Sequence, residues 1–210
     1  VTKSPILVFS PIKIDEIEEY QKYNIIATIT SKAEIIKLSK VKLKKRLKVH
    51  INIDTGMGRL GLSINEAAGL LLELSKNPNI KIDGMYSHYA TSDEKNKKFF
   101  TLQLNRFNKV ISELKKQKIN VGIIHTANSG AILNYPESYF EMVRVGISLY
   151  GYYPSNETSK SVKLKPVLSL ISEVASFTRF PKGSPISYGR RYKTKNETNI
   201  IFPKEKSTLN

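Results

Sequence analysis

The 210-residue chain contains no cysteine and no tryptophan, and no apolar run in it approaches the ~18 residues of a membrane-spanning helix. Without cysteine, disulfides and thiolate-metal sites are excluded. Because Val1 is not followed by a basic and then an apolar segment, we expect no secretory leader. The lack of cysteine permits a reducing compartment without proving one; we expect a cytoplasmic protein with no membrane partner and no metal site.

Acidic side chains are scarce: 18 Asp and Glu oppose 34 Lys and Arg, for a formal net charge of +16. The excess is uneven, since residues 32–50 carry eight basic and one acidic side chain and residues 160–210 carry eleven and three. Residues 51–159 are close to balanced, with twelve basic and ten acidic side chains. The lysines of 37–48 are not interleaved with aromatic residues, as single-strand binding would favour. We therefore interpret the charge as a solvated helix and tail, and expect no nucleic-acid partner.

Short apolar runs alternate with amphipathic segments over the first two-thirds of the chain. This alternation is typical of a parallel sheet with crossover helices. The predicted helices are residues 15–23, 32–46, 65–76 and 94–118. The predicted strands are residues 6–9, 25–29, 48–53, 80–87, 121–125 and 142–145.

The alternation of short apolar runs and amphipathic segments ends at about residue 150. Residues 151–163 have the composition of a linker, and residues 168–180 and 186–195 have that of strands, with a Pro/Gly turn between them. We expect a first domain over residues 1–155 and the beginning of a β domain over residues 160–210.

Reactive side chains follow four successive predicted strands. Arg59 lies in a glycine-rich loop, His88 and His125 end the next two strands, and Arg144 lies on the last. Ser129 opens a short helix after His125, where backbone amides can face an anion. Taken singly, each has a plain explanation as a turn arginine or a structural histidine. Because the carboxyl ends of parallel strands meet at one edge, the four together predict a functional site.

Five segments occur in a fixed order, and together they resemble alanine racemases over roughly residues 5–195. The resemblance implies an α/β fold: a (β/α)8 TIM-type barrel, here about six of its eight strands, followed by the start of a β domain. It also implies pyridoxal 5′-phosphate as cofactor, alanine as substrate, a two-base mechanism, D-alanine for peptidoglycan, and a homodimer that shares its active sites. The segments are Asp54-Thr-Gly-Met-Gly-Arg-Leu-Gly61, Tyr86-Ser-His-Tyr-Ala-Thr91, His125-Thr-Ala-Asn-Ser129, Val143-Arg-Val-Gly-Ile147 and Ile186-Ser-Tyr-Gly189.

The resemblance also implies roles for two arginines and two histidines. Arg59 matches the arginine near the phenolic oxygen of the cofactor and the substrate carboxylate, and it counts as a catalytic residue. Arg144 matches the arginine that hydrogen-bonds the pyridine nitrogen. His88 and His125 match the histidines that buttress this arginine. Since an arginine does not give up its proton, the ring nitrogen is expected to stay unprotonated.

Four further residues receive roles in the same way. Ser129, together with the amides of Gly146 and Ile147, matches the cradle for the cofactor phosphate. Tyr188 matches the catalytic tyrosine that acts on L-alanine from the partner subunit. From spacing alone, Tyr188 reads as an ordinary strand aromatic.

The chain departs from the family in three places. No segment matches the Ala-Val-x-Lys strand whose lysine binds the cofactor covalently, so we expect that strand and one other to precede Ile6, and the 210 residues alone to be inactive and to fold poorly. Residues 200–210 begin like the family and then diverge. Asn52 stands where many members carry a lysine that orients the arginine.

Two other readings stay open. A related racemase acting on serine or on several amino acids would share these segments. A non-catalytic, single-barrel protein that binds pyridoxal phosphate would share the barrel, but it has no use for Tyr188 or for a β domain.

Overall fold

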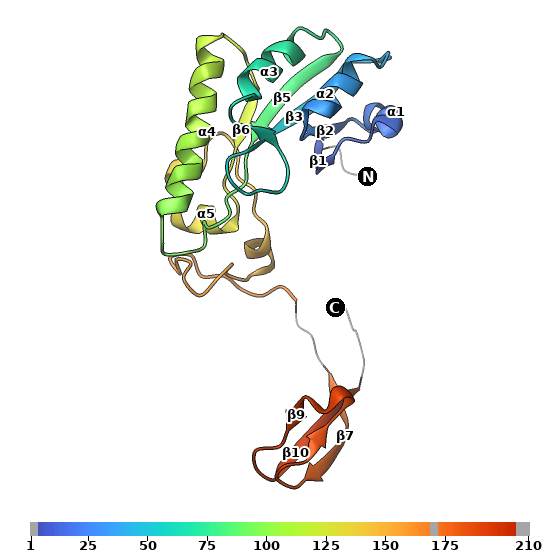
Figure 1. Ribbon diagram of the computed structural model, residues 1–210, viewed down its shortest axis with the longest axis vertical. Coiled ribbons are helices and arrows are strands. Elements are labelled where there is room, and N and C mark those ends of the chain that lie inside the picture. Colours follow the sequence, from blue (N-terminus) through green and yellow to red (C-terminus); the bar gives the residue numbers. More distant parts are fainter. Residues whose placement is uncertain (1–3, 169–171, 205–210) are drawn as a thin grey trace. The chain divides into compact units, whose positions relative to one another are not determined.

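The computed structural model describes residues 4–168 and 172–204. The chain divides into two compact units, residues 1–165 and residues 166–210 (Figure 1). None of the helices in the described ranges is long and apolar enough to cross a membrane.

The first unit is built on a parallel sheet in the order β1-β2-β3-β5-β6, with the short β4 paired to the end of β3. The predicted parallel strands at 6–9, 25–29, 48–53, 80–87 and 121–125 are confirmed. Their bounds are β1 Ile6–Pro11, β2 Ile25–Ile29, β3 Leu47–Asp54, β4 Leu62–Ser63, β5 Ile80–Tyr86 and β6 Ile123–His125.

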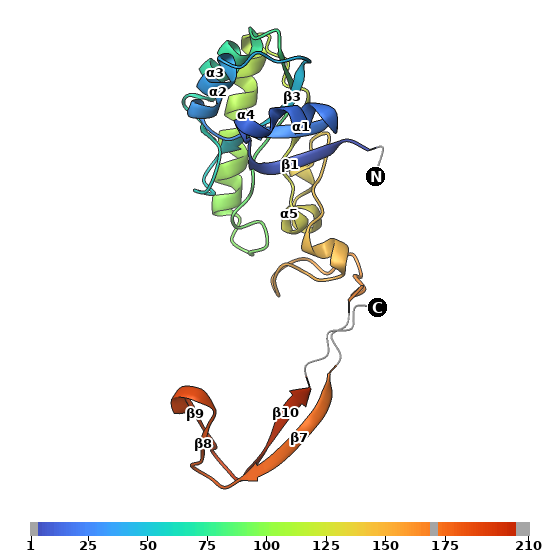
Figure 2. The ribbon, with the colours of Figure 1, turned by 90° about the vertical axis from the view of Figure 1, so that its right-hand side faces the viewer.

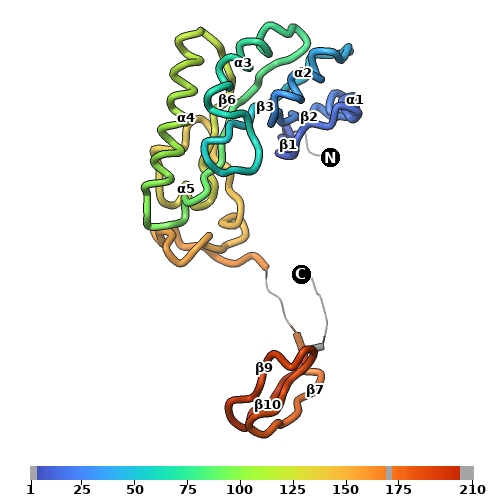
Figure 3. The backbone as a smooth tube through the Cα atoms, in the orientation of Figure 1, coloured from blue at the N-terminus to red at the C-terminus, as the bar shows by residue number. Residues whose placement is uncertain are grey.

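Helices cross over between consecutive strands, as Figure 3 lets the reader follow from blue to green. Parallel strands require such crossovers, and their repetition gives part of a TIM-type barrel. The helices are α1 (Ile17–Lys22, preceded by a 3-10 turn at Ile14–Glu16), α2 (Lys32–Ser39), α3 (Ala67–Ser75), α4 (Lys98–Lys116) and α5 (Ser129–Asn134). Two 3-10 turns follow, at Pro136–Ser138 and Ile147–Tyr150.

The core lies between the sheet and helices α2 to α4. Strand β3 is buried along most of its length because helices and neighbouring strands cover it, although apolar and polar residues alternate along its sequence. The fully buried side chains of this core include Ile29, Leu38, Ile51, Ile53, Leu71, Met85, Phe107 and Leu114.

Two predicted helices are too long. Helix α2 ends at Ser39, not at residue 46, because five of the seven residues 40–46 are Lys or Arg that would repel one another at helical spacing. Val41 and Leu43 instead pack against the core. Helix α4 begins at Lys98, not at residue 94. There the side chain of Asn96 accepts a hydrogen bond from the Lys98 N–H at 3.1 Å.

The predicted strand at 142–145 is wrong. Only Met142 forms a bridge, to His125 of β6. The Glu141 N–H donates to the carbonyl of Ile124 and the Arg144 N–H to that of Ala127. Residues 142–145 therefore run beside β6 without forming a regular ladder of hydrogen bonds. Among the described residues, no strand pairs with the other side of this segment.

The second unit consists of two antiparallel strand pairs. Strands β7 (Glu173–Phe180) and β10 (Thr198–Lys204) form a ribbon, and the connection between them contains the short pair β8 (Pro185–Ile186) and β9 (Tyr192–Lys193) (Figure 2). The predicted single strand at 186–195 is wrong, because positive φ angles at Ser187, Gly189 and Arg190 turn the chain there. Residues 169–171 of the predicted strand 168–180, and residues 205–210 of the divergent end, lie outside the described residues.

Candidate functional site

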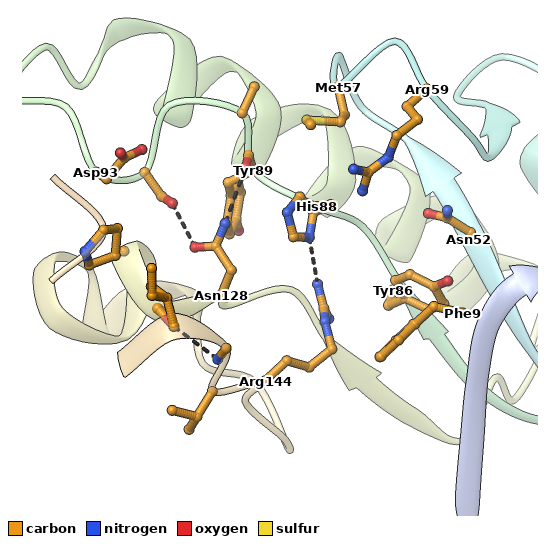
Figure 4. A pocket seen from close by; sticks show the side chains of 18 of the residues that line it. Phe9, Asn52, Met57, Arg59, Tyr86, His88, Tyr89, Asp93, Asn128 and Arg144 are labelled. Carbon is orange, nitrogen blue, oxygen red and sulfur yellow. Dashed lines mark hydrogen bonds between the residues drawn. The ribbon is translucent and has the colours of Figure 1, made fainter. Parts of the chain in front are cut away.

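A cavity of about 560 Å³ opens at the carboxyl ends of β3, β5 and β6. This is the edge at which parallel α/β barrels place their active sites. Figure 4 shows side chains from several loops pointing into it, with Arg144 reaching toward His88 and Arg59 entering from another loop. Six of the predicted site residues line the cavity: Arg59, His88, Ser129, Arg144, Gly146 and Ile147.

Arg144 is held entirely by neutral acceptors. One terminal nitrogen lies 2.6 Å from His125 Nδ1 and donates to the His125 carbonyl at 3.0 Å. The other donates to the carbonyls of Ser87 at 2.7 Å and Thr126 at 3.1 Å, and lies 3.5 Å from His88 Nδ1. No described carboxylate forms an ion pair with it. Burial lowers the pKa of Arg144 to about 10, so it remains a cation at neutral pH.

Two buried histidines extend this network into the barrel. Because arginine can only donate, His125 Nδ1 accepts from Arg144 and the proton of the neutral His125 lies on Nε2. That nitrogen lies 2.9 Å from His50 Nδ1, so the proton of His50 in turn lies on Nε2, a buried atom without a partner among the described residues. Burial lowers the pKa of His125 to about 2, helped by the Arg144 charge. Burial also lowers the pKa of His50 to about 4. Both rings are therefore neutral.

His88 also lies close to the charge of Arg144. Burial, helped by the charges of Arg144 and then Arg59, lowers its pKa to about 4. The ring is neutral at physiological pH and lies where a bound molecule would meet both arginines.

The loop that carries Arg59 depends on its glycines. The carboxylate of Asp54 accepts hydrogen bonds from the N–H groups of Gly56, at 2.9 Å, and Gly58, at 3.1 Å. Gly58 has a φ of 68°, in the left-handed region that glycine tolerates. A Cβ atom on Gly61 would lie 2.5 Å from the Asp54 nitrogen. The three glycines therefore let the loop turn back on the end of β3.

Ser129 ties the start of α5 to the loop at 146–148. Its hydroxyl oxygen accepts from the N–H groups of Gly146 at 2.9 Å and Ser148 at 3.3 Å. Asn128 precedes the helix as its N-cap and accepts from the Ala131 N–H at 3.1 Å. This corner of the cavity thus gathers a hydroxyl and backbone N–H groups.

A sequence model described as "Alanine racemase, N-terminal domain" matches residues 1–154. The chain belongs to the alanine racemase family. The alanine racemase of Clostridium novyi is 45% identical over 200 residues, which cover 93% of this chain and 52% of the relative. That of Clostridium tetani is 43% identical over 201 residues, covering 94% and 52%. The chain therefore spans about half the length of the curated relatives it matches.

Solved structures of the family superpose on the chain. The alanine racemase of Clostridium difficile 630 gives a TM-score of 0.81 at 32% identity, covering 95% of this chain and 53% of that one. The enzyme of Bacillus anthracis, solved with bound L-Ala-P, gives 0.80 at 36% identity, covering 95% and 53%. The α/β fold and its partial barrel are thereby confirmed.

The remaining predicted residues lie in different places. His125 does not line the cavity but supports Arg144 from behind. Asn52 lines it, and its side-chain amide donates to the Leu60 carbonyl at 3.3 Å, within the loop of Arg59. Tyr188 lies in the second unit, in the 3-10 turn Tyr188–Arg190, and is 99% exposed. Among the described residues, no cluster of three His, Asp or Glu side chains could hold a metal ion.

Sequence reasoning missed two supporting residues. His50 received no role, although the two-residue period of a strand places it on the same face as Asn52. Gln103 was overlooked within the apolar stripe of α4, where it shares a face with Phe100 and Phe107. For Gln103, a polar side chain at a position that periodicity assigns to the interior was the available signal.

Proposed function

We propose that this chain forms the cofactor-binding part of an alanine racemase that uses pyridoxal 5′-phosphate. One observation carries the proposal: a half-buried arginine with only neutral acceptors borders the same cavity as Arg59 and Ser129, in a chain 45% identical to an alanine racemase. A buried cation without an anion is costly, and a ligand with acceptor atoms offsets that cost.

The residues present fit the cofactor. Arg144 offers a donor that stays protonated to an aromatic ring nitrogen. Ser129 would offer its hydroxyl proton and Ile147 its backbone N–H to a phosphate, and the Gly146 N–H would exchange its bond to Ser129 Oγ for one to the phosphate. When bound, the cofactor supplies the electron-withdrawing ring that makes the α-hydrogen of an amino acid acidic. Because Arg144 hydrogen-bonds without giving up its proton, it limits how strongly that ring withdraws electrons.

The side chains would divide the remaining tasks. Arg59 binds and orients the substrate carboxylate, and the neutral His88 and His125 keep Arg144 in place. Tyr188 removes or returns a proton at the α-carbon on the L-alanine face, from the partner subunit of a homodimer. The full exposure of its ring supports this role, since the phenol is free to enter another site.

The second base would be the family lysine, which has no match in this sequence. We therefore propose that the 210-residue chain does not racemise alanine by itself. Residues 1–155 contribute the barrel part and residues 160–210 the beginning of the β domain. The complete enzyme would work in the cytoplasm and supply D-alanine for peptidoglycan.

A chimera tests the proposal. Residues of this chain replace the matched half of the Clostridium novyi relative, which supplies the remaining segments, and racemisation of L-alanine is followed by polarimetry. We expect the chimera to racemise alanine, and Tyr188→Phe to lower kcat by at least about 100-fold, as loss of a general base does. A folded chimera that binds pyridoxal phosphate but leaves alanine unchanged would overturn the proposal.

The same assay separates the open alternatives. Faster turnover of L-serine than of L-alanine would support the related racemase. Cofactor binding without turnover of any amino acid would support the non-catalytic barrel protein.

A further inference from the structure

The chain after β5 continues as a backbone segment, residues 87–92, whose polar groups are bonded mainly to side chains. His88 stands in this segment, so its position depends on those side chains and not on the sheet. Four side chains supply these bonds. The bonds run from Arg144 to the Ser87 carbonyl (2.7 Å), from Gln103 to the His88 carbonyl (3.0 Å), from Asn128 to the Tyr89 carbonyl (3.2 Å), from the Ala90 N–H to Gln103 (2.9 Å) and from Asn134 to the Ser92 carbonyl (2.8 Å).

Gln103 makes two of these bonds from within α4. Its side chain is fully buried, and its oxygen accepts from the Ala90 N–H while its nitrogen donates to the His88 carbonyl. Because one partner can only donate and the other can only accept, the orientation of the amide is fixed. The backbone on both sides of Tyr89 is thereby held to α4.

The same amide reaches the loop of Arg59. Its nitrogen also donates to Thr55 Oγ1 at 3.2 Å, and that hydroxyl lies 2.8 Å from the Ser87 hydroxyl. Arg106, on the same helix, donates to the Thr55 carbonyl at 2.9 Å. Gln103 therefore touches both segments that bring side chains to the cavity from β3 and β5.

Packing does not account for an amide at this position. An apolar side chain of similar size would fill the space between Phe100 and Phe107 without the free-energy cost of desolvating a polar group. The amide is matched to two particular loops, which an apolar residue would leave with unpaired polar atoms.

We propose that Gln103 is a positioning residue: it holds His88 against Arg144 and fixes the Arg59 loop across the cavity. The importance of this geometry for catalysis rests on the proposed function, but the positioning itself does not.

Three variants of the full 210-residue chain test the proposal. Gln103→Met keeps the size of the side chain and removes its hydrogen bonds. Gln103→Glu keeps an acceptor for Ala90 and, as the neutral acid, a donor for the His88 carbonyl. Gln117→Met makes the same change as the first variant at an exposed position just after the same helix.

The first readout is the pKa of His88, followed by NMR of labelled histidine in a chain with only three histidines. We expect Gln103→Met to raise this pKa from about 4 toward 6.5, because the ring moves away from Arg144 and into water. The His88 pKa in Gln103→Glu should lie between its values in Gln103→Met and in the parent chain. In Gln117→Met it should equal the parent value.

The second readout is the affinity for pyridoxal phosphate, measured by its absorbance. We expect Gln103→Met to weaken binding about tenfold, the effect of losing one or two net hydrogen bonds. A Gln103→Met chain that has a lowered melting temperature but unchanged His88 pKa and cofactor affinity would show a purely structural role and overturn the proposal. If the parent chain binds no pyridoxal phosphate, the affinity is measured in the chimera that supplies the missing segments, and a chimera that binds none contradicts the proposed function, while the His88 titration still decides whether Gln103 positions His88. Should Gln103→Met not fold, Gln103→Leu, which also removes the hydrogen bonds, takes its place, and a parental His88 pKa in that variant counts against the proposal.

Discussion

Five of the described side-chain hydrogen bonds around the cavity converge on Arg144. Its planar, forked donor group reaches two histidines and three backbone carbonyls. A lysine at the same place is a single point donor on a flexible stem. The charge alone therefore does not define this position, because the geometry of the fork matters as well.

We expect Arg144→Lys to lower the free energy of unfolding by about 2 kcal/mol, because buried carbonyls lose charged donors. Urea unfolding at pH 8 measures the change. Arg46→Lys is the matched control, since Arg46 is exposed and donates one hydrogen bond, to the Ile80 carbonyl; its change should stay within about 0.5 kcal/mol. Equal losses in the two variants would contradict the role assigned to the fork.

Because the pKa values of two histidines are lowered in the folded chain, we expect its stability to depend on pH. The pKa values of His50 and His88 are about 4 in the folded chain, below the 6.5 of an unperturbed histidine. Between these values the unfolded chain binds more protons than the folded one, so stability is full above pH 6.5 and falls as the pH drops. Urea unfolding at several pH values between 7 and about 5 should show this loss of stability. Most carboxyl groups titrate below this pH range. His50→Gln should flatten the slope, and a slope unchanged by it would contradict the assignment.

Gly84 makes room for the ring of His50, its partner on the neighbouring strand. A Cβ atom there would lie 2.3 Å from the His50 ring. We expect Gly84→Ala to displace His50 from His125 and to lower stability by about 2 kcal/mol, measured by thermal unfolding with histidine NMR. Gly69→Ala is the control: nothing lies near that glycine within α3, so stability should rise by up to about 1 kcal/mol.

At the residue scale, the sequence revealed the side chains that face the cavity better than those that support them. Arg59, His88 and Arg144 follow strand ends, and this position is visible as a pattern. His50 and Gln103 lie among apolar neighbours, and only three-dimensional packing shows which polar groups they meet.

Among the elements, α4 gives the clearest test of core packing. Leu114 is 1% exposed and Leu102 is 42% exposed, on the same helix. We expect Leu114→Ala to lower the free energy of unfolding by about 3 kcal/mol and Leu102→Ala to change it by no more than about 0.5 kcal/mol. Chemical denaturation of the two variants side by side measures the difference. Similar losses would mean that the outer face of α4 is covered in solution.

The strands were predicted more accurately than the ends of the helices. Strand Ile25–Ile29 consists mostly of β-branched residues, and in Leu47–Asp54 apolar residues alternate with polar ones, of which His50 and Asn52 are also buried. Helix ends depend on local hydrogen bonds, such as the one that Asn96 accepts from the Lys98 N–H, and on charge repulsion that a periodic stripe does not reveal. The segment 142–145 has the composition of a strand, but a regular ladder needs partners as well as composition.

At the scale of the whole molecule, every residue that lines the cavity lies within residues 1–165. We therefore expect a chain of residues 1–165 to keep the histidine NMR signals of the 210-residue chain, and its melting temperature within a few degrees. Shifted signals for His88 or His125 would show that the second unit contributes to the cavity.

The partial barrel was predicted from five segments that resemble a family, and not from periodicity alone. Alternating strands and helices predict a parallel sheet, but they do not distinguish a closed barrel from an open sheet. The second unit was predicted only as strand composition. The turn that presents Tyr188 depends on three positive φ angles, two of them at non-glycine residues, and sequence patterns rarely predict these.

The order of the strands in the sheet, β1-β2-β3-β5-β6, is also their order along the chain. Each strand can therefore dock on its predecessor as it leaves the ribosome, without waiting for later parts. The loops that carry Arg59, His88 and His125 are laid down in the same sequence. Arg144 emerges after all of them and donates back to segments already in place. A nascent chain that stops short of residue 144 would thus have its strands paired and its histidines without their common donor, so the cavity becomes organised only when that last arginine arrives.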